Sequence, residues 1–293
     1  MKTRKPHVAG QFYAGTEEEL KLQIASCFSH PFGPGSSPKV AGTGSRKIIG
    51  IVSPHAGYTY SGPVAAHGYS RLANDGIPQV FIILGPNHSG RGSGVSIETE
   101  GAWETPLGQA EIDSNLARRI QKGCEIIDVD EAAHKTEHSI EVQIPFIQYI
   151  SQGKTRFIPI CLWMQDLETS REIAKSIIDQ TSGTDFAIIA SSDFTHHERR
   201  LTEQEEHQML KRIEEADKRA IDAITSLDDS KLNELGETQE VTMCGYGPIT
   251  TLIAVAKLLG SVRAEFLAHK TSYDITQDSS YVVGYSSILF LRD

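Results

Sequence analysis

The chain has 293 residues, of which 39% are hydrophobic and 23% charged, proportions that are typical of a globular protein and argue against disorder. With 28 Lys and Arg against 38 Asp and Glu, the net charge is −10, which argues against a nucleic-acid partner. The apolar runs are far shorter than the ~20 residues of a membrane-spanning helix, and the N-terminus lacks an apolar signal core, so no membrane association or secretion is expected. The 4 Cys are widely spaced, which predicts a reducing, cytoplasmic location.

The predicted elements begin with a helix at residues 17–28. A loop follows at residues 31–45, where ten of the fifteen residues are Gly, Pro or Ser. Compact apolar strands then alternate with helical patterns. Strands are predicted at 47–53, 79–85, 155–162 and 186–191, and helices at 63–73, 114–123, 139–151, 167–181, 202–224 and 247–259. Two further strands, at 262–272 and 281–290, close the chain without a helix between them.

This alternation of continuous apolar strands and helices predicts an α/β fold whose sheet is covered by helices on both faces. The two final strands in succession predict an antiparallel edge, so the central sheet is expected to be mixed. The segment before the loop is too short to form a core of its own. Residues 1–293 are therefore predicted to form a single domain.

Three of the predicted strands run directly into polar clusters. The clusters are Pro54-His55-Ala56-Gly57-Tyr58, Pro86-Asn87-His88-Ser89-Gly90 and Ser192-Asp193-Phe194-Thr195-His196. Ligands of α/β sheets bind outside the carboxyl ends of the strands, so parallel strands would bring these clusters to one edge. A single histidine after one strand is usually a loop residue or a cap, but three such strand ends in one chain indicate a shared site.

Cys244 lies just before the apolar helix predicted at 247–259. The positive end of the helix dipole would lower the pKa of a thiol there and favour the thiolate, which binds metals or attacks electrophiles. The alternative is a buried packing residue, the commonest environment of a free cysteine. Both alternatives remain open for Cys244, whereas Cys27, Cys124 and Cys161 are predicted to be structural.

A further polar segment runs from His134 to Glu141. If a helix begins near Ser139, Glu137 and His138 lie at its mouth and Glu141 lies in its first turn, where negative charge is favourable. His134 and His138 have the i, i+4 spacing of a helical metal pair, but Ser139 can also cap the helix, which would leave that spacing outside it. These residues are predicted to lie beside the site, with His138 and Glu141 at the pocket rim.

These motifs resemble those of the Memo family (mediator of cell motility), known in prokaryotes as the Memo component of the AmmeMemoRadiSam gene grouping. The matching segments cover essentially the whole chain: Val8–Tyr13, Ser53–Tyr60, Leu84–His88, Trp103–Leu107, Glu137–Glu141, Ser191–His196 and Met243–Gly245. The resemblance implies one α/β domain with a central mixed sheet, similar in fold to class III extradiol dioxygenases, which use non-haem Fe(II).

The resemblance also implies which residues form the site: metal ligands His55, His88 and Cys244, neighbouring acid–base residues Asp193 and His196, and Tyr60 at the pocket rim. The dioxygenases hold iron with two His and a carboxylate, whereas Cys244 stands here where the carboxylate is expected. A thiolate is softer and donates more charge, so this sequence implies a redox site for Fe(II) or copper and does not favour ring cleavage.

Three functions are consistent with these residues. The first is a metal-dependent redox protein, an oxidoreductase of unknown substrate. The second is metal-free thiol chemistry, with Cys244 as nucleophile, His55 or His196 as base and Asp193 orienting that base. The third is a non-enzymatic module whose pocket binds a peptide or small molecule, as the resemblance to animal relatives linked to phosphotyrosine signalling implies. The gene grouping implies partnership with a radical-SAM protein and an AMMECR-type protein.

Overall fold

Apolar strands form the centre of the structure, a computed structural model that describes residues 2–41, 46–154, 156–198 and 203–293. The central sheet contains the strands β10 (His196–Glu198), β12 (Tyr281–Arg292), β2 (Ile48–Ser53), β9 (Phe186–Ser191), β3 (Val80–Pro86), β8 (Arg156–Leu162), β4 (Val95–Ile97) and β7 (Asp128–Val129), in this spatial order. β11 (Val262–Thr271) also pairs with β12. A small second sheet contains β1 (Thr3–Arg4), β5 (Ala102–Thr105) and β6 (Gly108–Glu111).

The four strands in the middle of the sheet are parallel. β9 lies between β2 and β3 and pairs with both, and β8 follows on the far side of β3. β12 is antiparallel to β2, and β4 is antiparallel to β8, so the sheet is mixed. The residues of β2, β3 and β9 are all buried, as continuous apolar strands covered on both faces should be. The predicted single-domain α/β fold with a mixed sheet flanked by helices is confirmed.

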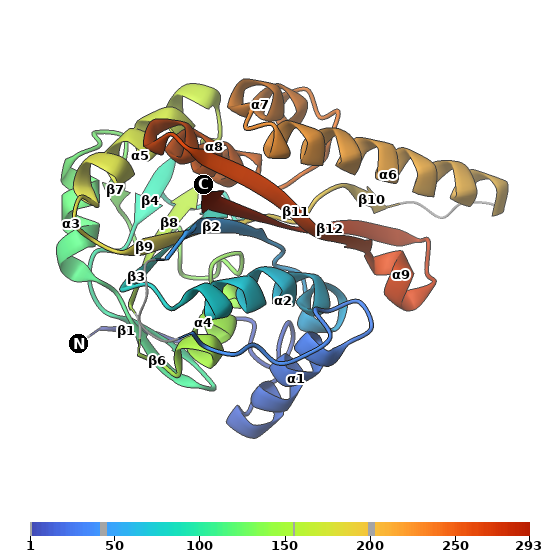
Figure 1. Ribbon diagram of the computed structural model, residues 1–293, viewed down its shortest axis with the longest axis horizontal. Coiled ribbons are helices and arrows are strands. Elements are labelled where there is room, and N and C mark those ends of the chain that lie inside the picture. The colour runs from blue at the N-terminus through green and yellow to red at the C-terminus, as the bar shows by residue number, and fades with distance from the viewer. Residues whose placement is uncertain (1, 42–45, 155, 199–202) are drawn as a thin grey trace.

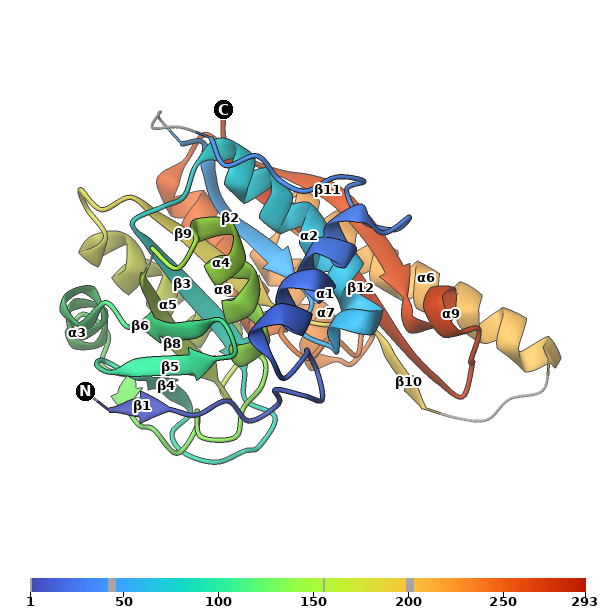
Figure 2. The same cartoon turned by 90° about the horizontal axis from the view of Figure 1, so that it is seen from below.

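Helices cover the two faces of this sheet (Figures 1 and 2). They are α1 (Glu17–Ser29), α2 (Tyr58–Asp75), α3 (Ser114–Lys122), the 3-10 helix η1 (Glu141–Gln143), α4 (Ile144–Ser151), α5 (Leu167–Gln180), α6 (Glu203–Thr225), α7 (Asp229–Glu237), α8 (Tyr246–Leu259) and α9 (Ser272–Thr276). α2 packs against β2 and β12 with α1 and α4 beyond it, whereas α8 packs on the opposite face with α5 and α7. Among the helices that the structure describes, none is long and apolar enough to cross a membrane.

The elements that sequence patterns did not predict are mostly short. β1, β4, β5, β6, β7 and β10 have two to four residues each, too few for a recognisable alternation. The helix predicted at 139–151 divides into η1 and α4, because the chain ahead of Glu141 forms turns. The described part of the predicted loop, residues 31–41, contains turns only, and residues 42–45 lie outside the described chain, as do residues 155 and 202 of the predicted strand and helix.

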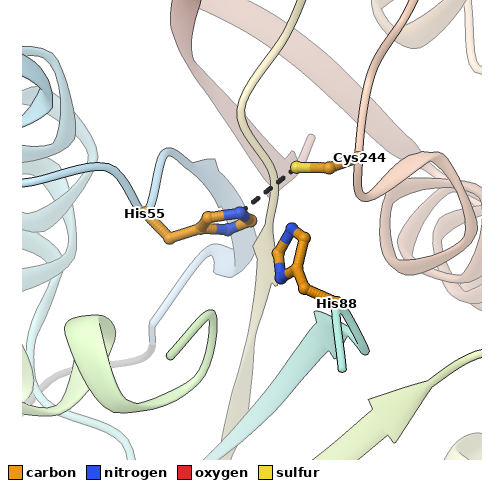
Figure 3. A group of neighbouring side chains, drawn as sticks. All are labelled: His55, His88 and Cys244. Atoms are coloured by element: carbon orange, nitrogen blue, oxygen red, sulfur yellow. Dashed lines mark hydrogen bonds between the residues drawn. The ribbon is translucent and has the colours of Figure 1, made fainter. Parts of the chain in front are cut away.

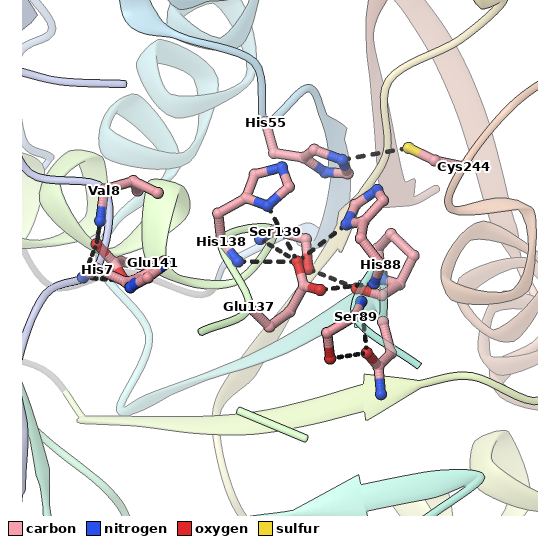
Figure 4. Close-up of polar contacts among 12 residues, drawn as sticks. His7, Val8, His55, His88, Ser89, Glu137, His138, Ser139, Glu141 and Cys244 are labelled. Carbon is pink, nitrogen blue, oxygen red and sulfur yellow. Dashed lines mark hydrogen bonds and ion pairs between the residues drawn. The ribbon is translucent and has the colours of Figure 1, made fainter. Parts of the chain in front are cut away.

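The N-terminal segment is attached to this body by the buried carboxylate of Glu141. The carboxylate accepts hydrogen bonds from the backbone N–H groups of His7 and Val8, each at 2.9 Å (Figure 4), and from the Tyr13 hydroxyl at 2.8 Å. It also forms an ion pair with Arg4 at 2.7 Å. Glu141 therefore faces the N-terminal segment and does not lie at the pocket rim, where it was predicted. Its carboxylate oxygens are bonded to the N-terminal segment instead.

The substitution Glu141→Gln should lower the free energy of unfolding by roughly 3–5 kcal/mol, because it leaves the largely buried guanidinium of Arg4 without its counter-charge. Glu17→Gln is the matched control, since Glu17 pairs with Lys21 on the exposed face of α1 and such pairs contribute at most about 1 kcal/mol. Urea unfolding of both variants measures the difference. Equal, small losses in the two variants would contradict this account of the N-terminal segment.

Candidate metal centre

Three loops at one edge of the sheet carry the candidate site. His55 follows the end of β2, His88 follows the end of β3, and Asp193 follows the end of β9. Because β2, β9 and β3 are parallel neighbours, these loops leave the sheet at the same edge. The three polar clusters therefore lie at one edge of the sheet, as was expected for parallel strands.

Cys244 reaches this edge on the loop that leads into α8. Gly245 makes the approach feasible, because a Cβ atom at this position would collide with the carbonyl oxygen of Ser191. The side-chain ligand atoms of His55, His88 and Cys244 all lie within 4.8 Å of one another, and His55 Nε2 is 3.2 Å from Cys244 Sγ (Figure 3). The structure thus brings together the three residues that were predicted to bind a metal ion.

The ring of His55 is oriented by a buried hydroxyl. His55 Nδ1 lies 2.8 Å from Ser191 Oγ. That hydroxyl donates its own proton to the carbonyl oxygen of Ser139 at 2.7 Å and accepts a hydrogen bond from Gln143 Nε2 at 2.8 Å. Ser191 Oγ can therefore only accept from His55, so Nδ1 carries the proton and Nε2 presents its lone pair toward Cys244. Burial holds the pKa of His55 well below its usual range, so the ring is neutral.

The ring of His88 is oriented by the carboxylate of Glu137. His88 Nδ1 lies 3.0 Å from Glu137 Oε1, and the carboxylate also accepts the backbone N–H groups of His88 at 2.6 Å, His138 at 2.8 Å and Ser139 at 2.9 Å (Figure 4). Burial alone would raise the pKa of Glu137, but these hydrogen bonds and the charge of His88 lower it to about 2. With Nδ1 bound to a carboxylate, His88 also directs Nε2 into the site, an arrangement common for metal-binding histidines.

The pKa values of His88 and Cys244 in the protein alone are set by burial and by neighbouring groups. Burial lowers the pKa of His88, but its contacts with Cys244 and Glu137 outweigh burial and raise it to about 10. Burial raises the pKa of the Cys244 thiol, against the opposing effect of His88, and the charge of Asp193 raises it further. The prediction that the start of α8 lowers this pKa is therefore wrong, because burial outweighs the helix dipole.

Asp193 joins two of the loops. Its carboxylate accepts the backbone N–H groups of His55 at 2.8 Å and Ala56 at 3.3 Å, while its own backbone N–H points at Cys244 Sγ at 3.3 Å. Burial raises the pKa of Asp193, although the hydrogen bond from His55 opposes this effect. Asp193 therefore fixes the separation of His55 and Cys244 besides lining the cavity next to them.

His196 lies in β10 and is held by Thr242, two residues before Cys244. Its backbone N–H donates to Thr242 Oγ1 at 2.8 Å, and its ring Nδ1 lies 3.1 Å from the Thr242 carbonyl oxygen. Because a carbonyl only accepts, Nδ1 carries the proton and Nε2 is the free acceptor. His196 lines the same cavity as Asp193, which leaves both residues within reach of a ligand bound there.

A cavity of about 690 Å³ opens onto these side chains, and the rim residues Tyr60 and His138 line it. Tyr60 is 41% exposed at the start of α2. The His138 ring stacks on His88, with ring centres 4.7 Å apart, and meets the edge of His55 at 5.4 Å. Burial lowers the pKa of His138 to about 4, so its ring is neutral at neutral pH. His138 is therefore a third imidazole at the site with one nitrogen that can accept a hydrogen bond.

Sequence patterns missed some of the residues that shape the site. Residues 131–140 contain turns and bends but no helix, so of the two alternatives left open the spacing of His134 and His138 lies outside the helix. His134 is buried against Trp103. Ser191 and Gln143 were not predicted as site residues. Ser191 begins the matching segment Ser191–His196 but also ends a predicted strand, and a glutamine inside an apolar helix carries no motif. Glu137 was placed only beside the site, although the carboxylate within the Glu137–Glu141 segment was a usable signal.

Comparisons with known proteins identify a family that the chain resembles over nearly its whole length. The family model described as "Memo-like protein" matches residues 4–289. A MEMO1 family protein of Methanopyrus kandleri is 45% identical over 291 residues, which cover 99% of both chains. A MEMO1 family protein of Sulfurisphaera tokodaii is 46% identical over 98% of this chain and 99% of its own, and one of Methanothermobacter thermautotrophicus is 45% identical over 97% and 99%.

The substitution Ser191→Ala should release the His55 ring, because Nδ1 loses the acceptor that fixes its proton. We expect nitrogen NMR of the ring to show the Nδ1–H tautomer in the wild type and a mixture in the variant, with metal affinity about 10- to 100-fold lower. Ser53→Ala is the matched control, since Ser53 lies opposite Ser191 in the parallel ladder and no hydrogen bond to the His55 ring is found for it among the described residues. An unchanged tautomer in Ser191→Ala would contradict the assignment.

Proposed function

The chain belongs to the Memo-like protein family, and we propose that it is a metal-dependent redox protein whose ion, Fe(II) or copper, is held by His55, His88 and Cys244. The observation that carries this proposal is the orientation of the two imidazoles. Each ring has its Nδ1 bound to a partner other than the three ligands, so both direct Nε2 toward the Cys244 sulfur. Such preparation of the ring is expected of ligands and is unnecessary for core packing.

The donor set fits a soft or borderline transition metal. Two imidazole nitrogens and one thiolate sulfur suit copper, iron or zinc, whereas Mg²⁺ and Ca²⁺ prefer oxygen ligands. The separation of 3.2 Å between His55 Nε2 and Cys244 Sγ is close to the roughly 3.5 Å expected for two ligands of one ion with bonds of about 2.0 and 2.3 Å. The cavity beside the site is large enough for a substrate. We choose a redox-active metal over zinc because of the resemblance to dioxygenases that use Fe(II) and because a thiolate ligand suits redox-active iron or copper.

When bound, Fe(II) or copper would supply electron transfer and would polarise a ligand at its open position. The chain's own residues would prepare that ligand. Asp193 and His196 both line the cavity and each presents an acceptor, so either can take a proton from a bound molecule. Asp193 would also hold His55 and Cys244 at the spacing that one ion requires, through its contacts with both.

Metal-free thiol chemistry is less well supported. A cysteine nucleophile needs a base that accepts its proton, and the pair is usually charged. Here burial raises the pKa of Cys244 and lowers that of His55, whose Nε2 is 3.2 Å from the sulfur, so both groups are neutral in the protein alone. His88 also contacts the thiol, but its pKa is raised to about 10, so it already holds a proton and cannot accept that of Cys244. A metal ion removes this obstacle, because it displaces the thiol proton directly.

The cellular location and the partner proteins are proposed on separate grounds. The four cysteines are all free, which suits a reducing compartment such as the cytoplasm. The radical-SAM and AMMECR-type partners implied by the resemblance stay predictions, as does the likeness of the fold to class III extradiol dioxygenases.

The substitution Cys244→Ser should abolish most metal binding and leave the fold intact. A serine hydroxyl is a poor ligand at neutral pH, and Cys244 lies at a partly exposed edge where the hydroxyl can meet water. Metal per chain and the urea midpoint of metal-stripped protein should be measured on the same preparations.

Cys161→Ser is the matched control, because Cys161 is fully buried in the core. It should cost roughly 1–3 kcal/mol of stability and leave metal loading unchanged. If Cys244→Ser behaved in this way instead, with normal loading and a destabilised fold, Cys244 would be a packing residue and the proposed function would fail.

Metal affinity should rise with pH. His88, with a pKa of about 10, and the Cys244 thiol, whose pKa is raised, both hold protons at neutral pH, so loading should release about two protons. His55 is already neutral and should release none. Affinity should therefore keep increasing from mildly acidic pH up to about 10, instead of levelling off near the ordinary histidine range of about 6.5. Chelator competition across this range measures the slope, and a flat profile would contradict the ligand set.

A further inference from the structure

The cavity beside the metal centre has an aromatic wall that the metal ligands do not need. The residues that form this wall are Phe12, Tyr60, Tyr281 and Tyr285. Tyr60 and Tyr281 are 41% and 52% exposed, which is a high exposure for large aromatic rings, whereas Tyr285 is buried. Aromatic faces directed into a cavity offer a negative electrostatic surface.

The three tyrosines lie close to one another and to a carboxylate. Tyr60, Tyr281 and Tyr285 all line the cavity that Asp193 lines. Burial raises the pKa of Tyr285, and the nearby carboxylate of Asp193 raises it further. Asp278 provides a second carboxylate at the mouth of the cavity. The aromatic wall therefore shares its cavity with two carboxylates, those of Asp193 and Asp278.

The described residues that line the cavity include no Lys and no Arg. The basic side chains among them are the imidazoles of His55, His88, His138 and His196. A phosphate or polycarboxylate ligand would thus meet two carboxylates and the faces of aromatic rings without a basic side chain at the aromatic end. Charge complementarity therefore points to a positively charged ligand beside the aromatic wall.

We propose that this cavity, named here the aromatic pocket (Phe12, Tyr60, Tyr281, Tyr285, Asp193 and Asp278), binds a small organic cation, a protonated or quaternary amine, as the substrate class of the metal centre. The ammonium group lies against the faces of Tyr60 and Tyr281 with Asp278 nearby, which is how aromatic cages recognise such groups. The rest of the molecule extends toward His55 and His88, which line the same cavity. The inference names a substrate class and so rests on the proposed function.

The test compares probes of one shape and different charge. Choline, its uncharged carbon isostere dimethylbutanol and the corresponding anion dimethylbutanoate should be titrated by NMR or calorimetry into metal-free and metal-loaded protein. Choline should bind roughly three- to thirtyfold more tightly than the neutral isostere, and the anion should bind more weakly still. The neutral isostere separates charge recognition from simple apolar burial.

Variants locate the effect in the aromatic pocket. Tyr281→Leu and Tyr60→Leu should each remove most of the preference for choline, whereas Tyr281→Phe, which keeps the ring face, should retain it. Trp163→Leu is the matched control, because Trp163 is 59% exposed, follows β8 at the same sheet edge and does not line the cavity. All three sites are exposed, so the fold should survive in the four variants, and melting midpoints verify this.

Equal binding of choline and its neutral isostere, preference for the anion, or an equal loss in Trp163→Leu would overturn the proposal. These results can be told apart from results that would refute the metal-dependent redox function. A protein that binds metal normally but shows no charge preference refutes only the substrate class. A protein that prefers choline in the aromatic pocket but never binds metal at His55, His88 and Cys244 refutes the redox function and keeps the cation site.

Discussion

The parallel pairing of β9 between β2 and β3 is the constraint on which the site depends. Parallel strands end at the same edge, so residues far apart in the sequence leave the sheet side by side. The strands are buried on both faces, so the polar loops that follow them are the first part of each segment that can line an open site. Cys244 completes the group from outside the sheet, and it can do so only because Gly245 passes close to the end of β9.

Buried polar groups also fix which nitrogen of each imidazole faces the site. Ser191, Gln143 and Ser139 form one connected chain of hydrogen bonds behind His55, and Glu137 supports His88 together with three backbone N–H groups. Leaving any of these groups unpaired in the interior would be costly, so the network specifies both the tautomer and the orientation of each ring. The core thereby prepares the two imidazoles before any ion arrives.

Much of this could be read from the sequence, and the reasons for the rest are physical. Continuous apolar strands predicted the sheet and its layers, and polar clusters behind three strands predicted one common edge. The approach of Cys244 depends on how α8 packs, which no local pattern encodes. The pKa of its thiol was mispredicted because a helix start is visible in sequence but burial is not. The role of Ser191 depends on its neighbours in space, and Glu141 looked like a site residue until its contacts with the N-terminal segment were known.

The account can be tested most directly by X-ray diffraction at the iron and copper absorption edges, on crystals of protein freshly purified without chelators. It predicts a single anomalous peak per chain, bonded to His55 Nε2, His88 Nε2 and Cys244 Sγ at about 2.0–2.4 Å, at one of those two edges. A peak at other residues, or protein that stays metal-free after exposure to both metals with these three side chains ordered, would contradict the central claim.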